Sequence, residues 1–199
     1  MRAPRMVTTC VVSIAAAGAL LLSGCGSGAT ASGMTCVEGS DCAVGDTGPG
    51  GGVVFYRAEV EQPWGRYLEA APDGWNQGGQ DPLAVWCDNT KSKLDGAWGK
   101  GIGSGAANTQ ALVEKCASVS AVLADDYSGG GKEDWFLPSR DELVELYKQR
   151  DMVDDADDQY WSSSQSDAQG AWSLNFQNGS LYQQSVKDSW LFVRPVRAF

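Results

Sequence analysis

The chemistry that the residue types most clearly allow is disulfide formation by four cysteines, Cys36, Cys42, Cys87 and Cys116. In an exported protein an even number predicts two disulfides, with three possible connectivities. The short spacing of the first two favours a local pair, and the other two would close a loop of about 30 residues contributing roughly 3.6 kcal/mol. Two thiolates on a metal are the weaker alternative, because the chain has no C-x-x-C spacing.

Histidine is missing from the chain, which excludes Ser-His-Asp and Cys-His catalysis and every histidine metal site. An acidic run from Asp151 offers oxygen ligands to calcium but lacks the spacing and the glycine of an EF-hand. A solvated loop is therefore favoured, and no cofactor is expected. Calcium stays a weak candidate on four residues of that run, namely Asp154, Asp155, Asp157 and Asp158.

Aromatic rings flanked by amides suit sugar rings or peptide side chains. Residues 74–105 are rich in Gly, Asp, Asn and Trp and have little periodicity, as functional loops often do. The alternative, which the frequent burial of tryptophan favours, is that the rings pack this long loop down. The candidate ligand-binding residues, from this region and from two similar segments, are Trp64, Trp75, Asn76, Trp86, Trp98 and Trp190.

The N-terminal segment predicts export and lipidation. Arg2 and Arg5 precede an apolar run over residues 11–22, and Ser23 and Gly24 lead into Cys25. This order is typical of a lipoprotein signal peptide over residues 1–24, after which Cys25 is acylated, with palmitate among the expected chains. A plain secretory signal is the alternative. Residues 25–34 then form a flexible tether, and residues 35–199 form one domain.

The net charge of the chain limits the classes of partner that it can bind. The formal net charge is −10, and removing residues 1–24 removes two arginines and no acid, which makes it −12. Such a chain should be repelled by nucleic acid and by anionic lipid headgroups. The expected partners are therefore the membrane, through the lipid anchor, and an extracellular glycan or protein.

Two helices are expected in the middle of the chain. The first runs from Asn108 or Thr109 to about Asp125, and its apolar stripe places Cys116 toward the core. The second follows a capping box of the S-x-x-E type that begins at Ser139. The glycines of residues 99–105 fit neither phosphate-loop pattern and predict a turn before the first helix.

Short strands flank these helices, and Asn178-Gly179 is a hairpin signal between two of them. Two helices followed by a run of strands indicate an α+β domain. The strands are expected at residues 53–56, 66–71, 160–164, 171–176, 181–186 and 191–197.

Several motifs together resemble the Lcl C-terminal domain family over residues 45–199. The family is associated with bacterial surface proteins and related to the C-type-lectin-like fold. The resemblance therefore implies a disulfide-stabilised fold of that type, in which residues 53–56 would pair with residues 192–196. Trp135, Trp161 and Trp172 lie in its motifs and are expected in the core, because large aromatic side chains dominate buried area. The motifs are Gly48–Tyr56, Tyr67–Pro72, Asp134–Ser139, Asp141–Leu143, Tyr160–Ser164, Ala171–Trp172 and Val193–Phe199.

The sequence departs from the family's better-known relatives. The sugar and calcium motifs of calcium-dependent lectins are broken at Trp64 and Gln77. One member of the family binds sulfated glycans, which require a basic patch. That ligand does not carry over, because the acidic excess faces few candidate lysines: Lys91, Lys93, Lys100 and Lys132.

The function expected from the sequence is a non-catalytic binding or adhesion module. It would be held by lipid on the extracytoplasmic face of a cell membrane and would recognise a glycan or a protein. One alternative is an enzyme of the formylglycine-generating or glycan-hydrolysing type, although no carboxylate pair stands out. A structural envelope protein without a ligand is the other.

Overall fold

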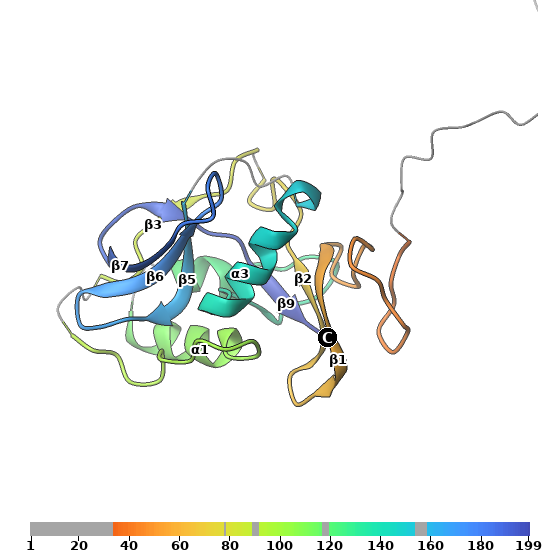
Figure 1. The fold of residues 1–199 in the computed structure, drawn as a ribbon, viewed down its shortest axis with the longest axis horizontal. Coiled ribbons are helices and arrows are strands. Elements are labelled where there is room, and N and C mark those ends of the chain that lie inside the picture. Colours follow the sequence, from red (N-terminus) through yellow and green to blue (C-terminus); the bar gives the residue numbers. More distant parts are fainter. Residues whose placement is uncertain (1–33, 78, 89–91, 117–119, 154–158) are drawn as a thin grey trace, which may run out of the picture. The chain divides into compact units, whose positions relative to one another are not determined.

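The computed structural model describes residues 34–77, 79–88, 92–116, 120–153 and 159–199. They form the mixed α+β domain that the sequence predicts (Figure 1). None of the described helices is long and apolar enough to cross a bilayer. The elements are β1 (Val53–Gln62), β2 (Gly65–Ala70), β3 (Leu83–Ala84), α1 (Gly105–Lys115), α2 (Ser120–Asp125), β4 (Trp135–Phe136), α3 (Arg140–Lys148), the 3-10 turn η1 (Arg150–Met152), β5 (Gln159–Gln165), β6 (Gly170–Asn175), β7 (Leu181–Val186), β8 (Leu191–Phe192) and β9 (Val196–Ala198).

The strands form two sheets. Sheet A has the order β1-β2-β9-β4 and is antiparallel, with Leu68 opposite Ala198 and Phe136 opposite Val196. Sheet B has the order β3-β8-β5-β6-β7, and its β5–β8 pair is parallel. Helix α3 packs against β1 of sheet A and against β5 and β6 of sheet B (Figure 1). A single apolar cluster therefore joins α3 to both sheets.

The expected pairing of the first strand with the last is wrong, because β2 lies between them. A two-residue connection after Gln62 folds β1 and β2 into a hairpin, and β9 adds to the free edge of β2. The predicted final strand is also divided. Residues 193–195 separate β8 from β9, and Pro195 has no N–H to donate to a ladder.

The predicted first helix is two helices. Helix α1 begins after Ser104, earlier than expected, and ends at Lys115, because the backbone becomes extended at Cys116. Helix α2 starts at Ser120, whose N–H donates to the carbonyl of Val85 at 3.0 Å. The apolar stripe continues across this interruption, so hydrophobic periodicity alone did not reveal the break.

The predicted capping box of α3 is present, and its glutamate also fixes the start of α1. Glu142 is buried, and its carboxylate accepts N–H groups from Ser139 at 2.6 Å and from Gly103 at 2.7 Å. Burial raises the pKa of Glu142 above its usual value. The glycine-rich turn thus serves to bring its N–H groups onto a buried acid, and the turn expected there is confirmed.

A buried carboxylate also explains the glycine run before β1. Glu69 accepts N–H groups from Gly50 at 3.0 Å and Gly52 at 3.2 Å. A Cβ on Gly50 would overlap the ring of Trp135, and one on Gly52 would overlap the carbonyl of Ala70. The backbone can approach Glu69 this closely only where side chains are missing.

Arg197 is the counter-ion of Glu69 and a hub of sheet A. Its guanidinium, buried on β9, contacts Glu69 at 3.0 Å, Glu38 at 2.7 Å and Asp134. Three segments distant in sequence therefore meet at one side chain. Burial raises the pKa of Glu69 despite these contacts, since desolvation is the largest influence on it.

The structure contains both disulfides that the cysteine spacing favours, Cys36–Cys42 and Cys87–Cys116. The second ties the irregular region before α1 to the end of that helix. Lys187, buried beside it, strengthens this attachment by donating to the carbonyls of Ser92 and Ala168 and to Gln165. Desolvation lowers the pKa of Lys187 to about 8.

Candidate functional site

The structure does not bring the six predicted ligand residues together. Trp86 is fully buried and donates its indole N–H to the carbonyl of Ser162 at 2.7 Å. Its assignment as a ligand residue is therefore wrong, because the ring is part of the core that holds the loop down. Trp161 and Trp135 are buried as predicted. Trp172 is only half-buried, with Arg140 5.1 Å and Lys100 5.4 Å from its ring centre.

Three other predicted ligand tryptophans come from separate segments of the chain. Trp64 is half-buried with its ring centre 6.3 Å from that of Tyr56, and it covers Gly103. Trp98 is 38% exposed with Lys93 at 5.9 Å, and Trp190 is 67% exposed. None of these three lines a described pocket.

The remaining two candidates, Trp75 and Asn76, line one pocket of about 440 Å³. This volume lies in the range of ligand sites. The pocket is formed by the turn that follows β2 and by the chain at the end of α2. We call it the Trp75 pocket, and its lining residues are Trp75, Asn76, Gln77, Leu123, Asp126, Tyr127 and Ser128.

Two aromatic rings form a corner of this pocket. The ring centres of Trp75 and Tyr127 are 5.2 Å apart, with an angle of 70° between the planes. Tyr127 also packs at 4.9 Å against buried Trp135, and Gly129 leaves room for its phenol. Burial raises the pKa of Tyr127 above its usual value, and the charge of Glu69 adds to this, so the hydroxyl remains a donor.

The polar side chains of the Trp75 pocket are not engaged elsewhere in the described structure. Their side chains make no hydrogen bond or ion pair with any other described residue, and they are Asn76, Gln77, Asp126, Tyr127 and Ser128. Gln77 also has a positive φ of 64°, which is unfavourable for a residue other than glycine. Local backbone strain of this kind is often found at functional sites, and the exposed polar groups beside it are free to bind a ligand.

Backbone hydrogen bonds hold both walls. The N–H of Trp75 donates to Pro72 at 3.2 Å, and that of Gln77 donates to Gly74 at 2.9 Å. On the other wall, the N–H of Asp126 donates to the carbonyl of Val122 at 2.8 Å and so prolongs the last turn of α2. Residues 126–128 of this wall were not among the predicted site residues, because they follow directly on the helix end expected at about Asp125. An aromatic residue between Asp and Ser before a glycine run was the available signal.

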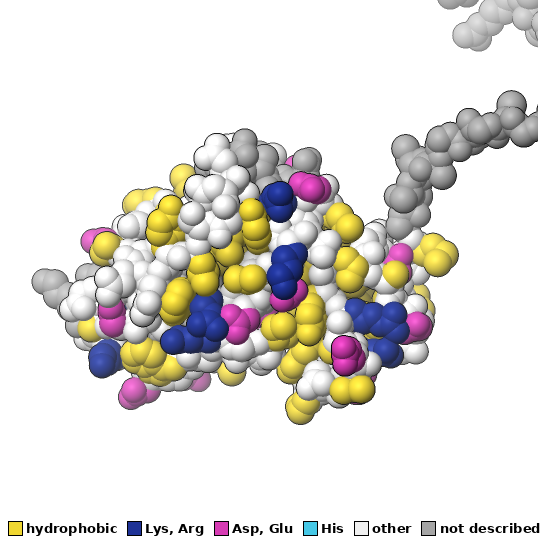
Figure 2. Space-filling model, in the orientation of Figure 1, with side chains coloured by type: hydrophobic (Ala, Val, Ile, Leu, Met, Phe, Trp, Pro, Cys, Tyr) yellow, Lys and Arg dark blue, Asp and Glu magenta, His cyan; other side chains and the backbone are white. Residues whose placement is uncertain are grey.

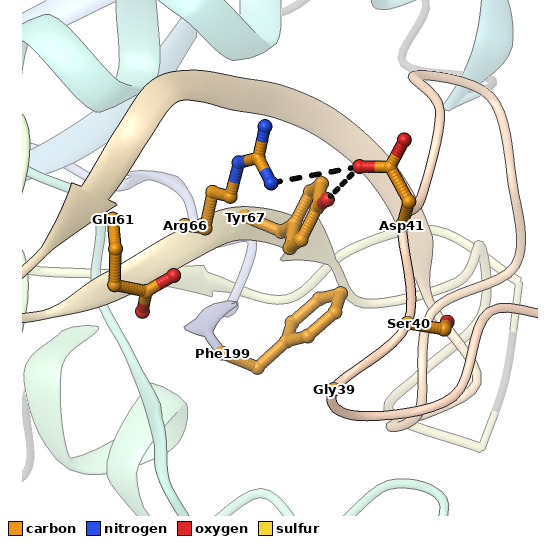
Figure 3. Close-up of a pocket in the computed structure, with 7 residues that line it drawn as sticks. All are labelled: Gly39, Ser40, Asp41, Glu61, Arg66, Tyr67 and Phe199. Carbon is orange, nitrogen blue, oxygen red and sulfur yellow. Dashed lines mark hydrogen bonds and ion pairs between the residues drawn. The ribbon is translucent and has the colours of Figure 1, made fainter.

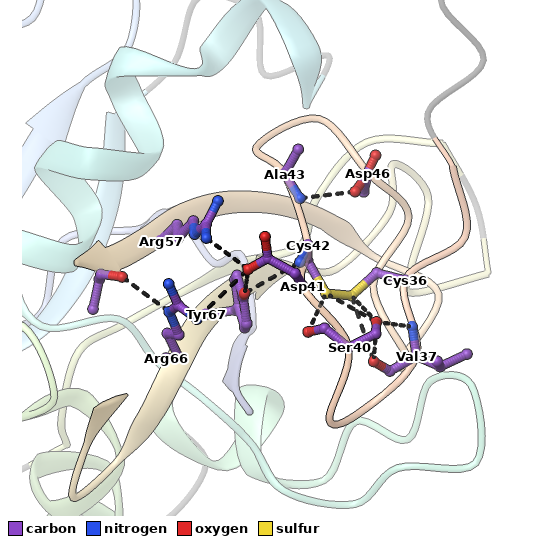
Figure 4. A network of polar contacts seen from close by, with 11 residues as sticks. Cys36, Val37, Ser40, Asp41, Cys42, Ala43, Asp46, Arg57, Arg66 and Tyr67 are labelled. Carbon is purple, nitrogen blue, oxygen red and sulfur yellow. Dashed lines mark hydrogen bonds and ion pairs between the residues drawn. A yellow bond between two sulfur atoms is a disulfide. The ribbon is translucent and has the colours of Figure 1, made fainter. Parts of the chain in front are cut away.

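A second pocket of about 480 Å³ differs in that much of its polar chemistry is already used (Figure 3). Asp41 receives the hydroxyl of Tyr67 at 3.0 Å and pairs with Arg57 at 2.6 Å and Arg66 at 3.5 Å (Figure 4). The hydrogen bond from Tyr67, followed by the two arginines, lowers the pKa of Asp41. The Cys36–Cys42 loop presents this aspartate to the strands, so the contacts fasten that loop to β1 and β2.

Possible metal ligands are limited in the described part of the chain. The only described group close enough for an ion is Cys87, Asp88 and Cys116, and the disulfide uses both of its sulfurs. This favours the disulfide over the thiolate metal site that the sequence left as an alternative. The weak calcium candidates of residues 154–158, and the lipidation candidate Cys25, lie outside the described residues.

The surface charge is mixed. On the face drawn in Figure 2, lysine and arginine side chains form small, separate groups, with acidic side chains beside several of them. The described part of this face therefore offers no broad basic patch of the kind that sulfated glycans require.

Comparison with known families gives one match. A sequence model of the Lcl C-terminal domain matches residues 75–197, which include every lining residue of the Trp75 pocket. No curated protein matches the chain. Hairpin β1–β2, which pairs with β9, precedes the matched region.

Proposed function

The chain belongs to the Lcl C-terminal domain family, and on this premise we propose that it is a non-catalytic binding module on the extracytoplasmic face of a membrane. Acylated Cys25 anchors it, and the Trp75 pocket recognises an extracellular glycan or a protein. We also propose that the α+β domain has a C-type-lectin-like architecture, as the family resemblance implies. In support, a disulfide ties the long irregular region before α1 to the end of that helix.

The observation that carries this proposal is the contrast between the two pockets. At the Trp75 pocket, aromatic rings stand beside amide, carboxylate and hydroxyl groups that no described residue engages. At the other, Asp41 is held by three neighbours. An aromatic wall with open hydrogen-bonding groups suits a sugar, which offers apolar ring faces and hydroxyls.

Replacing Trp75 by alanine should weaken binding to the best ligand of a glycan array by about tenfold or more, since the ring provides the main apolar contact. The array is run with calcium and with chelator, and each variant's thermal unfolding shows whether it remains folded. Trp190→Ala is the matched control, because Trp190 is exposed and lies outside the pocket. Equal losses in both variants, or loss in Trp190→Ala alone, would refute the proposed site. Asn76→Ala tests the contribution of the side-chain amide at the pocket edge, and it leaves the core unchanged because Asn76 is exposed.

The anchor is tested separately in cells. Cys25→Ala should move the protein from the membrane fraction to the soluble fraction and abolish the mass of the acyl chains, because several buried chains are needed for stable attachment. Intact-mass analysis of both fractions checks this. Normal membrane attachment and processing of the alanine variant would contradict the lipoprotein assignment.

A further inference from the structure

The Trp75 pocket carries one negative charge and no positive one among the described residues that line it. Asp126 is exposed at its edge and makes no ion pair with any described residue. The chain as a whole, Asp126 included, has a formal net charge of −10. An unpaired carboxylate at a pocket disfavours anionic ligands and favours cationic ones.

The aromatic corner has the same preference. Trp75 and Tyr127 pack edge to face at 70°, and both line the pocket, so aromatic surface from two side chains borders it. Aromatic faces carry a negative quadrupole potential and attract ammonium groups, with tryptophan the strongest of the aromatic side chains. The remaining lining groups add amides from Asn76 and Gln77 and a hydroxyl from Ser128.

We propose that the Trp75 pocket selects glycans with free, protonated amino groups, that is, amino sugars without the N-acetyl group. This inference rests on the proposed function and specifies its ligand. The ammonium group lies at the corner of Trp75 and Tyr127 within reach of Asp126, and the amides bind sugar hydroxyls. An amino sugar carries its ammonium group and several hydroxyls on one rigid ring, so it can reach the carboxylate and the amides of Asn76 and Gln77 together, and we take it as a better fit than a lysine side chain.

The test compares short oligomers of glucosamine and of N-acetylglucosamine of equal length, at a pH at which the free amines are protonated. Affinities for the purified full-length chain are measured by calorimetry. The glucosamine oligomer should bind about tenfold more tightly, as expected for an ammonium at an aromatic corner with a carboxylate. Asp126→Asn should remove most of this preference and leave affinity for the acetylated oligomer nearly unchanged.

The control is Asp125→Asn, which makes the same charge change one residue away. Asp125 accepts a hydrogen bond from Gln110 at 2.8 Å and does not line the pocket. If this variant loses as much preference as Asp126→Asn, the attraction is a general effect of an acidic surface and the inference is wrong.

Other outcomes separate the two proposals. Equal or tighter binding of the acetylated oligomer overturns the amine preference and leaves the glycan-binding proposal intact. If neither oligomer binds but another glycan of the array binds in a way that depends on Trp75, the amine preference is again overturned and the glycan-binding proposal stands. A lysine-rich peptide that binds through Asp126 while both oligomers fail overturns the inference in favour of a protein ligand. If no ligand is found whose binding depends on Trp75, both proposals are wrong.

Discussion

Arg197→Met should lower the free energy of unfolding by about 3–5 kcal/mol at neutral pH, as expected when one partner of a buried ion pair is removed. Methionine keeps much of the volume of the side chain but leaves Glu69 buried without a counter-ion. Glu38 and Asp134 also lose their contact with β9. Denaturant unfolding followed by tryptophan fluorescence measures the change.

The deficit of Arg197→Met should shrink as the pH falls. Burial already raises the pKa of Glu69, and without Arg197 this pKa rises further. A carboxyl with a higher pKa in the folded state than in the unfolded state binds a proton on folding, so stability increases as the pH falls through this window. Hydrogen bonds from Lys132 and then from Arg197 lower the pKa of Glu38, and losing the contact with Arg197 acts in the same direction.

Arg57→Met is the matched control, since Arg57 is 38% exposed and pairs with an aspartate that is 69% exposed. It should cost no more than about 1 kcal/mol, as exposed pairs do. A loss in Arg197→Met no larger than in this control, or a deficit that grows in acid, would contradict the account of Glu69.

Replacing Cys87 and Cys116 together by alanine should cost roughly 3–4 kcal/mol. The bond spans 29 residues and restricts the unfolded chain by an amount that grows with loop length. The sulfurs are also buried against the core, so their removal loses packing. Chemical denaturation of the double variant gives the value.

The matched comparison is the double alanine variant of Cys36 and Cys42, whose bond spans only 6 residues. Loop entropy predicts a loss of roughly 2.4 kcal/mol there. The longer loop should therefore cost more than the shorter one. A reversed order would show that strain or residual structure in the unfolded state, and not loop length, determines the effect.

Local signals in the sequence predicted the local structure well. The capping box at Ser139, the hairpin turn at Asn178-Gly179 and the core position of Cys116 each depend on a few adjacent residues, and each is present. The division of the first predicted helix depends on a distant partner, because Ser120 bonds to Val85. Periodicity within one segment carries no information about such a contact.

The candidate site shows the same limit. Trp75 and Asn76 were identifiable because aromatic and amide residues adjoin in an irregular segment. Asp126 and Tyr127 come from 50 positions further on, and only the fold places them opposite. Trp86 has a similar sequence context to Trp75, yet it is buried, because it packs into the core and donates to Ser162 of β5. Composition indicates which residues can bind, but the packing of the sheets decides which rings remain available.

The position of β9 in the interior of sheet A has a consequence for the order of folding. Strand β2 is made early and its partner β9 about 130 residues later, with Leu68 opposite Ala198. Until residues 196–198 emerge, the edge of β2 is unpaired and Glu69 lacks its arginine. Pairing across such a separation is slow, and an open strand edge invites association with other chains. The nascent chain should therefore depend on protection from aggregation until its synthesis reaches β9.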